Sequence, residues 1–323
     1  MACLPHPLRP LPILLCLLAL SATLSPQQVN PRKLKPEDDV YLIGDRKVGS
    51  GIDFYSQKKE IALGQELARQ VEENSVVIKD PEVNEYVNRL AQNLVRNSDA
   101  KVPFTVRVLR DDSINAFALP GGYFFVNSGL ILGLNEEDEL AGAMAHEIAH
   151  VAARHATRNM TKGELLSLAT IPVEIAAGPG LGGLGVAEAA DLIVPMKYMS
   201  FTRGAEREAD WLGVQYLWKA GYDPMGMVRA FQVLEELDKK RPGLFDRAFA
   251  SHPQTPDRVA TSEREIATIL PPRQEYVVNT SDFNRVKLRL AKLIEGAKVK
   301  AAPGANRPPA PPGPPVITRT PNP

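Results

Sequence analysis

The chain has 323 residues, of which 44% are hydrophobic, and its 38 lysine and arginine residues are balanced by 38 aspartate and glutamate residues. This length allows one catalytic domain with flanking segments, and the composition is that of an ordinary globular protein. The formal net charge is zero, and the chain therefore lacks the surplus of basic residues that a nucleic-acid-binding protein has. We expect no nucleic acid among its partners.

The first 26 residues are organised as a secretory signal peptide. Arg9 precedes an apolar run over residues 11–24, and small residues mark the end of that run. The run is shorter than a comfortable membrane span, although an uncleaved anchor is the alternative. We therefore predict export to the periplasm or cell envelope. Both cysteines, Cys3 and Cys16, lie in this leader, so any metal in the remainder must be bound through nitrogen and oxygen.

Three segments are predicted after the leader. Residues 27–51 are polar and lack helical periodicity, and we interpret them as a linker. Residues 52–295 carry the helical and strand patterns of one folded domain, without a repeat of 20 to 50 residues. Residues 296–323 are rich in proline and are interpreted as a disordered tail.

The folded domain is predicted to be α+β, with helices predominating. Asp80-Pro81 is a typical helix start, and Pro120-Gly121-Gly122 is a turn between two short strands. Asn135 is expected to cap a long helix that ends near Met160. The helices are expected over residues 57–73, 81–96, 136–160, 202–220, 224–240 and 256–270, and the strands over 104–109, 113–119 and 123–126.

Residues 165–199 are apolar and rich in glycine, with prolines that interrupt any regular element. Glu174, Glu188 and Asp191 argue against a membrane-spanning helix. One interpretation is a surface loop with short helices. The other is a mobile cover near a functional site, or an element that touches the membrane peripherally.

The most informative motif is His146-Glu147-Ile148-Ala149-His150. A helix advances about 100° per residue, so the two imidazoles would point within about 40° of each other, one turn apart. Histidines in this arrangement are zinc ligands in hydrolytic enzymes. Glu147 falls on the flank of the same face, where it can reach a metal-bound water without binding the metal. The motif therefore predicts a hydrolytic zinc site.

A catalytic zinc usually has three protein ligands and one open position, so a third ligand is required. Glu206 and Asp210 are one helical turn apart and share a face, whereas Glu208 points elsewhere. Glu206 is predicted to bind zinc, and Asp210 to accept a hydrogen bond from the non-ligating nitrogen of His146. The alternative is a solvated helix with local charge pairs, but the histidine motif upstream favours the metal site.

Two further histidines follow the motif. On a continuous helix His155 points roughly 140° away from His150, so it is predicted to face solvent on the back of the helix. His252 lies in a loop beside prolines. It is either a surface residue or, if the fold brings it over the zinc, a fourth ligand or an oxyanion donor.

The chain resembles the zinc metallopeptidase family that contains the CAAX prenyl protease, the HtpX-type membrane proteases and the periplasmic BepA-type enzymes (peptidase family M48). It is most similar to the soluble, exported branch of that family. The resemblance covers about residues 52–291. Four segments carry it, in order: Asn-Ala-Phe-Ala-Leu-Pro-Gly-Gly at 115–122, the His-Glu-x-x-His motif at 146–150, Glu-Arg-Glu-Ala-Asp at 206–210, and Ser-His-Pro-Gln-Thr-Pro-Asp-Arg at 251–258.

The resemblance implies a zincin-like (gluzincin) domain with a small β-sheet beside the active-site helix. It also implies one zinc ion per chain, with His146, His150 and Glu206 as ligands and Glu147 as catalytic base. In BepA-type members the histidine that matches His252 can occupy the zinc in a resting state. BepA-type enzymes carry C-terminal helical repeats, whereas this chain ends in a proline-rich tail, so their repeat-mediated partners are not expected.

The predicted function is an exported zinc metalloendopeptidase that cleaves unfolded or misassembled envelope proteins. Asn115, Ala116 and Phe117 are predicted to hold the substrate backbone by strand addition. One alternative is a non-proteolytic, metal-stabilised chaperone or binding protein that uses the same groove; Glu147 argues against it, because a binder needs no base. A membrane-embedded protease is the second alternative, and the lack of an apolar span after the leader argues against it.

Overall fold

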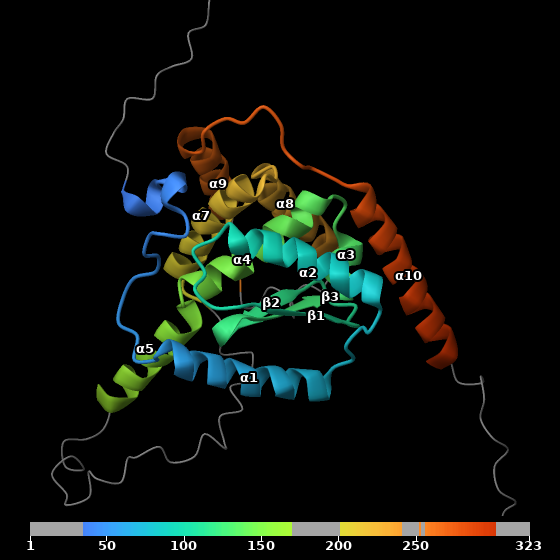
Figure 1. Cartoon of the computed structure of the whole chain (residues 1–323), viewed down its shortest axis with the longest axis horizontal. Helices are drawn as coiled ribbons and strands as arrows, with labels where there is room; N and C mark the ends of the chain where they lie inside the picture. The colour runs from blue at the N-terminus through green and yellow to red at the C-terminus, as the bar shows by residue number, and fades with distance from the viewer. Residues whose placement is uncertain (1–34, 170–200, 241–251, 253–255, 302–323) are drawn as a thin grey trace, which may run out of the picture. The chain divides into compact units, whose positions relative to one another are not determined.

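A computed structural model describes residues 35–169, 201–240, 252 and 256–301, which Figure 1 shows as coloured ribbon. The predicted signal peptide, nearly all of the 165–199 segment and most of the predicted tail lie outside these residues. The predicted fold class is confirmed, because the described chain is mostly helical and contains one three-stranded sheet. Among the helices described, none has the length and apolarity needed to cross a lipid bilayer.

The helices predicted from sequence are present with small shifts of their ends, apart from the one that carries the histidine motif. The helical elements are η1 (Pro36–Asp38), η2 (Val40–Leu42), α1 (Gln57–Asn74), α2 (Pro81–Arg96), η3 (Pro120–Gly122), α3 (Ser128–Gly133), α4 (Glu137–Ala152), α5 (His155–Ala169), α7 (Arg203–Ala220), α8 (Met225–Lys240), α9 (Pro256–Ile269) and α10 (Ser281–Ala301).

The helix ends follow the local chemistry of the sequence. The carboxylate of Asp80 accepts a hydrogen bond from the backbone N–H of Val83 (3.1 Å), as predicted for the N-cap of α2. The hydroxyl of Thr202 caps α7 in the same way, accepting from Ala205 N (3.3 Å). Gly221 ends α7 in a left-handed conformation that favours glycine. These signals are local, so they were visible before the tertiary structure was known.

The sheet has the order β1-β3-β2. β2 (Ala116–Leu119) runs antiparallel to β3 (Tyr123–Asn127), and β1 (Thr105–Leu109) runs parallel to β3 on its other side. The turn between β2 and β3 requires glycine, since φ is +73° at Gly121 and +89° at Gly122. β2 is therefore an edge strand, and α4 packs beside it.

The helix that carries the histidine motif differs from its prediction. Asn135 does not cap it: α4 begins at Glu137, and the Glu139 carboxylate accepts a hydrogen bond from the backbone N–H of Glu136 (3.2 Å). Nor does the helix continue to Met160. α4 ends at Ala152, and a separate helix, α5, begins three residues later.

Arg154 causes this break. Its φ is +55°, the left-handed region, and it is the only non-glycine residue with a positive φ among those described. Its guanidinium donates to the carboxylate of Glu60 on α1 (2.7 Å) and to the carbonyl of Tyr55 (2.6 Å). Contacts with a distant part of the chain therefore hold a conformation that helical periodicity does not predict.

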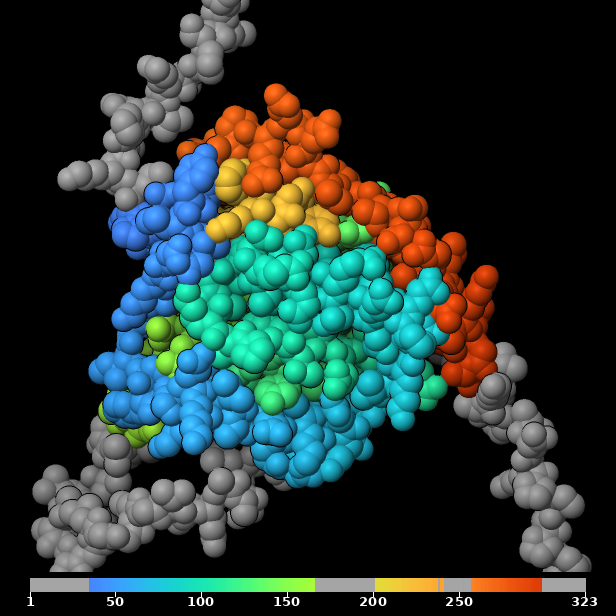
Figure 2. Space-filling view, viewed as in Figure 1, coloured from blue at the N-terminus to red at the C-terminus, as the bar shows by residue number. Residues whose placement is uncertain are grey.

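Part of the predicted linker packs on the folded domain. Val40 and Ile43 are 3% exposed and belong to the hydrophobic core. The backbone N–H of Gly44 donates to Asp99 (2.7 Å), and Arg46 forms a buried ion pair with the same carboxylate (2.9 Å). Figure 2 shows this blue segment lying directly against the teal and yellow parts of the chain. Within this polar segment, the backbone of Gly44 and the side chain of Arg46 are thus bound to Asp99.

Helix α10 has no counterpart among the predicted elements. Its buried face is made by Phe283, Val286, Leu290 and Ile294, at helical spacing. Phe283 lies 6.4 Å from the ring of Tyr86 on α2. Because α10 continues to Ala301, the first residues of the predicted disordered tail are helical.

Candidate metal centre

Four nitrogen and oxygen donors converge inside the domain. His146 and His150 project from α4, Glu206 from the first turn of α7, and His252 from the segment before α9; one donor atom of each lies within 4.8 Å of the others. All four residues are at most 4% exposed. The structure therefore brings together the three predicted zinc ligands and His252, for which a surface position, a fourth ligand and an oxyanion donor were the alternatives.

Glycines let α4 approach α7 and α8 closely enough for the four donors to converge. A Cβ atom on Gly142 of α4 would lie 2.6 Å from the Cα of Met227 on α8. A Cβ on Gly213 of α7 would lie 3.3 Å from the backbone nitrogen of His146. α4 can thus pack directly on α7 and α8, and its histidines face the carboxylate of Glu206.

The spacing of the donors is close to that of a tetrahedral zinc site. With Zn–N distances of 2.0 to 2.1 Å, neighbouring ligand atoms of a tetrahedral site lie about 3.3 to 3.4 Å apart. The Nε2 atoms of His146 and His150 are 3.1 Å apart; Nε2 of His146 lies 3.5 Å from Oε2 of Glu206, and Nε2 of His150 lies 3.5 Å from Oε1 of the same carboxylate. Nδ1 of His252 is 3.4 Å from Nε2 of His146 and 2.9 Å from Glu206 Oε1. A set of imidazoles and one carboxylate is also the donor chemistry that zinc prefers.

The carboxylate of Asp210 lies beside the outer nitrogen of His146, and the hydrogen bond between them stays a prediction. Its Oδ1 lies 3.0 Å from Nδ1 of His146, the nitrogen that faces away from the cluster. Arg258 holds this carboxylate with two hydrogen bonds of 2.7 Å, from Nε and Nη2, and its Nη1 lies 3.1 Å from Glu206 Oε2. In the sequence, Arg258 stands out only as the last residue of the segment at 251–258 that resembles the family. No spacing rule predicted that this cation would neutralise two buried carboxylates.

The cluster perturbs the protonation of its own members. Burial lowers the pKa of His146, but the Asp210 and Glu206 carboxylates outweigh burial and raise it to about 9. Burial lowers the pKa of His150, and the neighbouring imidazoles of His146 and His252 lower it further. Burial raises the pKa of Glu206, yet its contacts with His146 and His252 bring it below the usual value. Without a metal ion, these shifts favour the protonated form of His146 and the neutral form of His150.

Glu147 lies at the edge of the cluster, next to the sheet. It is 5% exposed, and its Oε2 accepts a hydrogen bond from the backbone N–H of Ala118 on β2 (3.3 Å). Its Oε1 lies 3.5 Å from Nε2 of His252. The carboxylate thus faces the donor cluster on one side and an edge strand on the other, as a base beside a bound peptide would.

The predicted substrate strand is β2 with the residue before it. The carbonyl of Asn115 already accepts from Asn127 N (2.9 Å), so its backbone faces β3. Backbone direction alternates along an antiparallel strand, so Phe117 also faces β3, whereas Ala116 and Ala118 face the open edge. The backbone groups that point away from β3 are therefore those of Ala116 and Ala118, and of these the N–H of Ala118 already donates to Glu147.

The prediction for His155 is wrong. This residue is 5% exposed, and its Nδ1 lies 2.9 Å from Nδ1 of His150. Its Nε2 lies 3.1 Å from the carboxylate of Glu208, which was predicted to point elsewhere. The prediction assumed a continuous helix, but the left-handed residue Arg154 turns the chain and brings His155 back toward the cluster.

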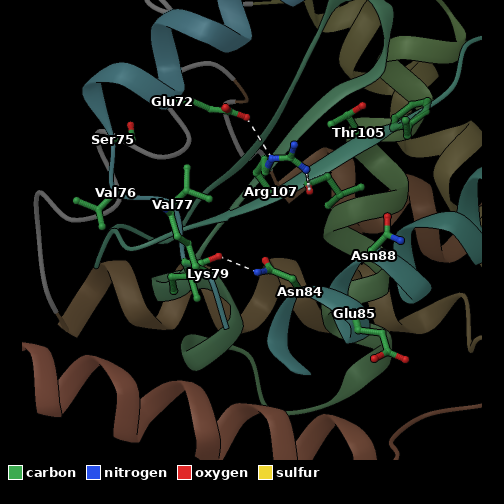
Figure 3. A pocket seen from close by; sticks show the side chains of 13 residues that line it. Glu72, Ser75, Val76, Val77, Lys79, Asn84, Glu85, Asn88, Thr105 and Arg107 are labelled. Atoms are coloured by element: carbon green, nitrogen blue, oxygen red, sulfur yellow. Dashed lines mark hydrogen bonds and ion pairs between the residues drawn. The ribbon is translucent and has the colours of Figure 1, made fainter. Parts of the chain in front are cut away.

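Two cavities differ in their relation to this cluster. A cavity of about 540 Å³ adjoins it at Glu206 and Arg258 and is lined by residues of α7 and α9 together with Phe201. A groove of about 1030 Å³ lies elsewhere, between the end of α1, α2 and β1 (Figure 3). The groove contains the exposed Glu72–Arg107 ion pair (3.2 Å) and no residue of the donor cluster.

A helix with a His-Glu-x-x-His motif beside a helix that supplies a glutamate defines a zincin-like metallopeptidase fold. The sequence profile of Peptidase family M48 matches residues 78–266, more than half of the chain. The chain therefore belongs to peptidase family M48, as the resemblance indicated.

Relatives of known name support the same assignment. A Vibrio cholerae protein is 36% identical over 256 residues, which are 76% of this chain and 51% of the relative. The Beta-barrel assembly-enhancing proteases of Yersinia pestis and Escherichia coli K12 are 31% and 29% identical, over 80% and 74% of this chain and 53% and 50% of their own lengths. This chain thus spans about half the length of these relatives.

Proposed function

We propose that this protein is a zinc-dependent metalloendopeptidase of the cell envelope that hydrolyses peptide bonds in unfolded or misassembled proteins. The observation that carries the proposal is the convergence of His146, His150 and Glu206 at spacings close to those of a tetrahedral site, with the Glu147 carboxylate beside them. Membership of a peptidase family supports the same chemistry.

In this proposal one zinc ion is held by His146, His150 and Glu206, and Glu147 transfers the protons. A bound zinc ion supplies Lewis acidity, which lowers the pKa of water at the site toward about 7 and polarises a carbonyl. Glu147 accepts the proton of the attacking water and returns it to the leaving amine. Burial of Glu147 against Ala118 keeps its carboxylate directed at the site. Asp210 and Arg258 keep His146 oriented.

An extended, unfolded polypeptide is the substrate that the site favours. At the edge of β2 that faces away from β3, the backbone of Ala116 and the carbonyl of Ala118 can pair with an incoming peptide as an added strand, and the N–H of Ala118 joins in once it releases Glu147. A folded protein has no free strand of this kind to present. The predicted leader and the names of the relatives support a role in the envelope, in quality control of proteins under assembly.

His252 closes the fourth position in this proposal. Its Nδ1 lies among the donors, and its Nε2 lies 3.5 Å from Glu147 Oε1. The imidazole therefore stands where water and the scissile carbonyl would have to enter, and His252 must withdraw before a substrate is cleaved.

Cleavage of casein by the purified full chain tests the proposal, with metal content measured on the same samples. Wild type should contain one zinc per chain, lose activity with a chelator and regain it with zinc. Glu147→Gln should retain zinc and lose activity by about 10²- to 10⁴-fold, the usual contribution of a general acid–base group. Glu85→Gln, the same change at an exposed position of α2, is the matched control and should behave as wild type.

Two results would reject the peptidase. One is full cleavage by Glu147→Gln, because the base would then be dispensable. The other is zinc-bound wild type that suppresses client aggregation but cuts neither casein nor unfolded outer-membrane proteins. That second result would instead support the metal-stabilised chaperone.

A further inference from the structure

His150 makes a contact on the side away from the donor cluster. Its Nδ1 lies 2.9 Å from Nδ1 of His155, and Nε2 of His155 lies 3.1 Å from Glu208 Oε2. The other oxygen of Glu208 accepts a hydrogen bond from the backbone N–H of Gly49 (2.8 Å). A series of hydrogen-bond contacts thus connects the N-terminal segment to a proposed metal ligand, in the order Gly49, Glu208, His155, His150.

We propose that His155 and Glu208 are positioning residues that set the tautomer and ring orientation of His150 for metal binding. The proposal rests on the zinc site proposed above. It assigns a role to two residues that helical periodicity directed away from the site.

The order of hydrogen-bond donors along the chain follows from the groups at its ends. The Glu208 carboxylate has only acceptors, so Nε2 of His155 carries a hydrogen and donates to it. In the neutral form of His155 its Nδ1 is then an acceptor, and Nδ1 of His150 carries the hydrogen that it accepts. His150 is left with a lone pair on Nε2, the atom that faces the other donors. A metal ligand needs that tautomer.

The two histidines of the motif are therefore oriented by different groups. Asp210 contacts the outer nitrogen of His146 directly, whereas a carboxylate reaches His150 only through a second imidazole. Because the intermediate group is a neutral imidazole, His150 gains less electron density from its support than His146 does. The relay nevertheless fixes the position of a hydrogen that would otherwise be free to move to Nε2.

Several contacts hold His155 and His150 in place. Arg154 turns the chain in its left-handed conformation and is tied to Glu60 on α1 (2.7 Å). The ring of His150 stacks on Phe201, with centroids 4.1 Å apart and planes 27° apart. His155 is 5% exposed and His150 3%, so water is not at hand to replace a missing hydrogen-bond partner. Loss of the acceptor on His155 would leave a buried N–H unpaired.

Three variants separate this role from simple packing. His155→Phe keeps an aromatic ring of similar size but has no acceptor. His155→Asn is smaller, yet its amide oxygen can reach the position of Nδ1 and accept from His150. Glu208→Gln retains a single acceptor oxygen for two donors, the N–H groups of Gly49 and His155.

Zinc affinity is measured on the full chain by competition with a chromophoric chelator. Removal of a group that orients a metal ligand typically costs 10- to 100-fold in affinity. We expect a loss in this range for His155→Phe, at most a few-fold loss for His155→Asn, and an intermediate loss for Glu208→Gln.

A second measurement reads the tautomers without metal. In ¹⁵N-histidine spectra of the chelator-treated protein, the ring of His150 should carry its proton on Nδ1 and the ring of His155 should carry its proton on Nε2. In His155→Phe the His150 signals should shift toward a mixture of tautomers. The chain has five histidines, so the signals can be assigned by single substitutions.

The possible outcomes are distinguishable. If wild type does not bind zinc, the proposed function fails, and the tautomers in the metal-free spectra still decide the hydrogen-bond order. If wild type binds zinc and His155→Phe binds it within two-fold of wild type, the positioning role is overturned. Equal losses in His155→Phe and His155→Asn, with equally lowered thermal midpoints, would mean that packing alone accounts for the effect and would also overturn it.

Discussion

Arg258 provides the most quantitative test of how this site is held together. It is 5% exposed and donates two hydrogen bonds of 2.7 Å to Asp210, which is 3% exposed, while its Nη1 lies 3.1 Å from Glu206. Replacing the guanidinium by an apolar side chain, Arg258→Met, leaves two buried carboxylates without their main cation. The perturbation therefore acts on folding before it acts on chemistry.

The expected cost in the free energy of unfolding is about 3 to 5 kcal/mol, the range for breaking one partner out of a buried ion pair. A domain of 150 to 250 residues loses about 2 to 4 °C of thermal midpoint per kcal/mol, so Tm should fall by roughly 6 to 20 °C. Excess zinc should restore part of this loss, since a divalent cation beside Glu206 replaces some of the missing positive charge.

Circular dichroism melts and urea unfolding, each with chelator and with excess zinc, measure these changes. Arg264→Met is the matched control, because Arg264 is exposed on the same helix and should change stability by no more than about 0.5 kcal/mol. A double-mutant cycle with Asp210→Asn should give an interaction energy of about 1 to 3 kcal/mol.

If Arg258→Met unfolds within 1 kcal/mol of wild type in chelator, the guanidinium does not stabilise the fold as expected. If the effects of Arg258→Met and Asp210→Asn simply add, the two groups do not act as a pair.

Three further outcomes are expected. In the metal-free protein the pKa of His146 is raised to about 9, because the Asp210 and Glu206 carboxylates outweigh the lowering by burial. The contribution of this group to the free energy of unfolding, about 3 kcal/mol, is therefore complete below pH 6.5 and is lost as the pH rises through 9. Urea unfolding in chelator should show this decline, and a stability that does not change with pH would contradict it. Gly142→Ala should lower the free energy of unfolding by about 1 to 3 kcal/mol because its Cβ meets the backbone of α8 at 2.6 Å, whereas Gly296→Ala, with open space around it, should be neutral or gain up to about 1 kcal/mol in thermal melts. His252→Ala should raise casein cleavage, by about ten-fold if the open form is one tenth populated in wild type, and unchanged or lower activity at full zinc occupancy would show that this imidazole does not block the site.

Local patterns account for the part of this protein that its sequence predicted well. Caps such as Asp80 and Thr202 mark helix starts because the side chain bonds the backbone three residues later. The spacing of His146 and His150, and that of Glu206 and Asp210, puts each pair on one face of a helix whatever the rest of the fold does. Residue types and helical geometry were therefore enough to assemble the list of candidate ligands.

Contacts between distant segments account for the rest. Residues such as Arg46 look like linker residues until Asp99, more than fifty positions away, supplies a partner. Which backbone groups of β2 point away from β3 depends on the register of the two strands, and that register is set by the whole sheet.

The sequence by itself determined which side chains share a helix face, because that follows from a fixed rotation per residue. It did not determine that His155 faces inward, because one left-handed residue, Arg154, reverses that rotation, and the contacts that stabilise it come from α1 and the segment before it. Nor did it determine that Arg258 neutralises Asp210 and Glu206, since a buried ion pair between two helices exists only once both helices are packed. Periodicity is a property of the chain, whereas the partners of a buried charge are a property of the fold.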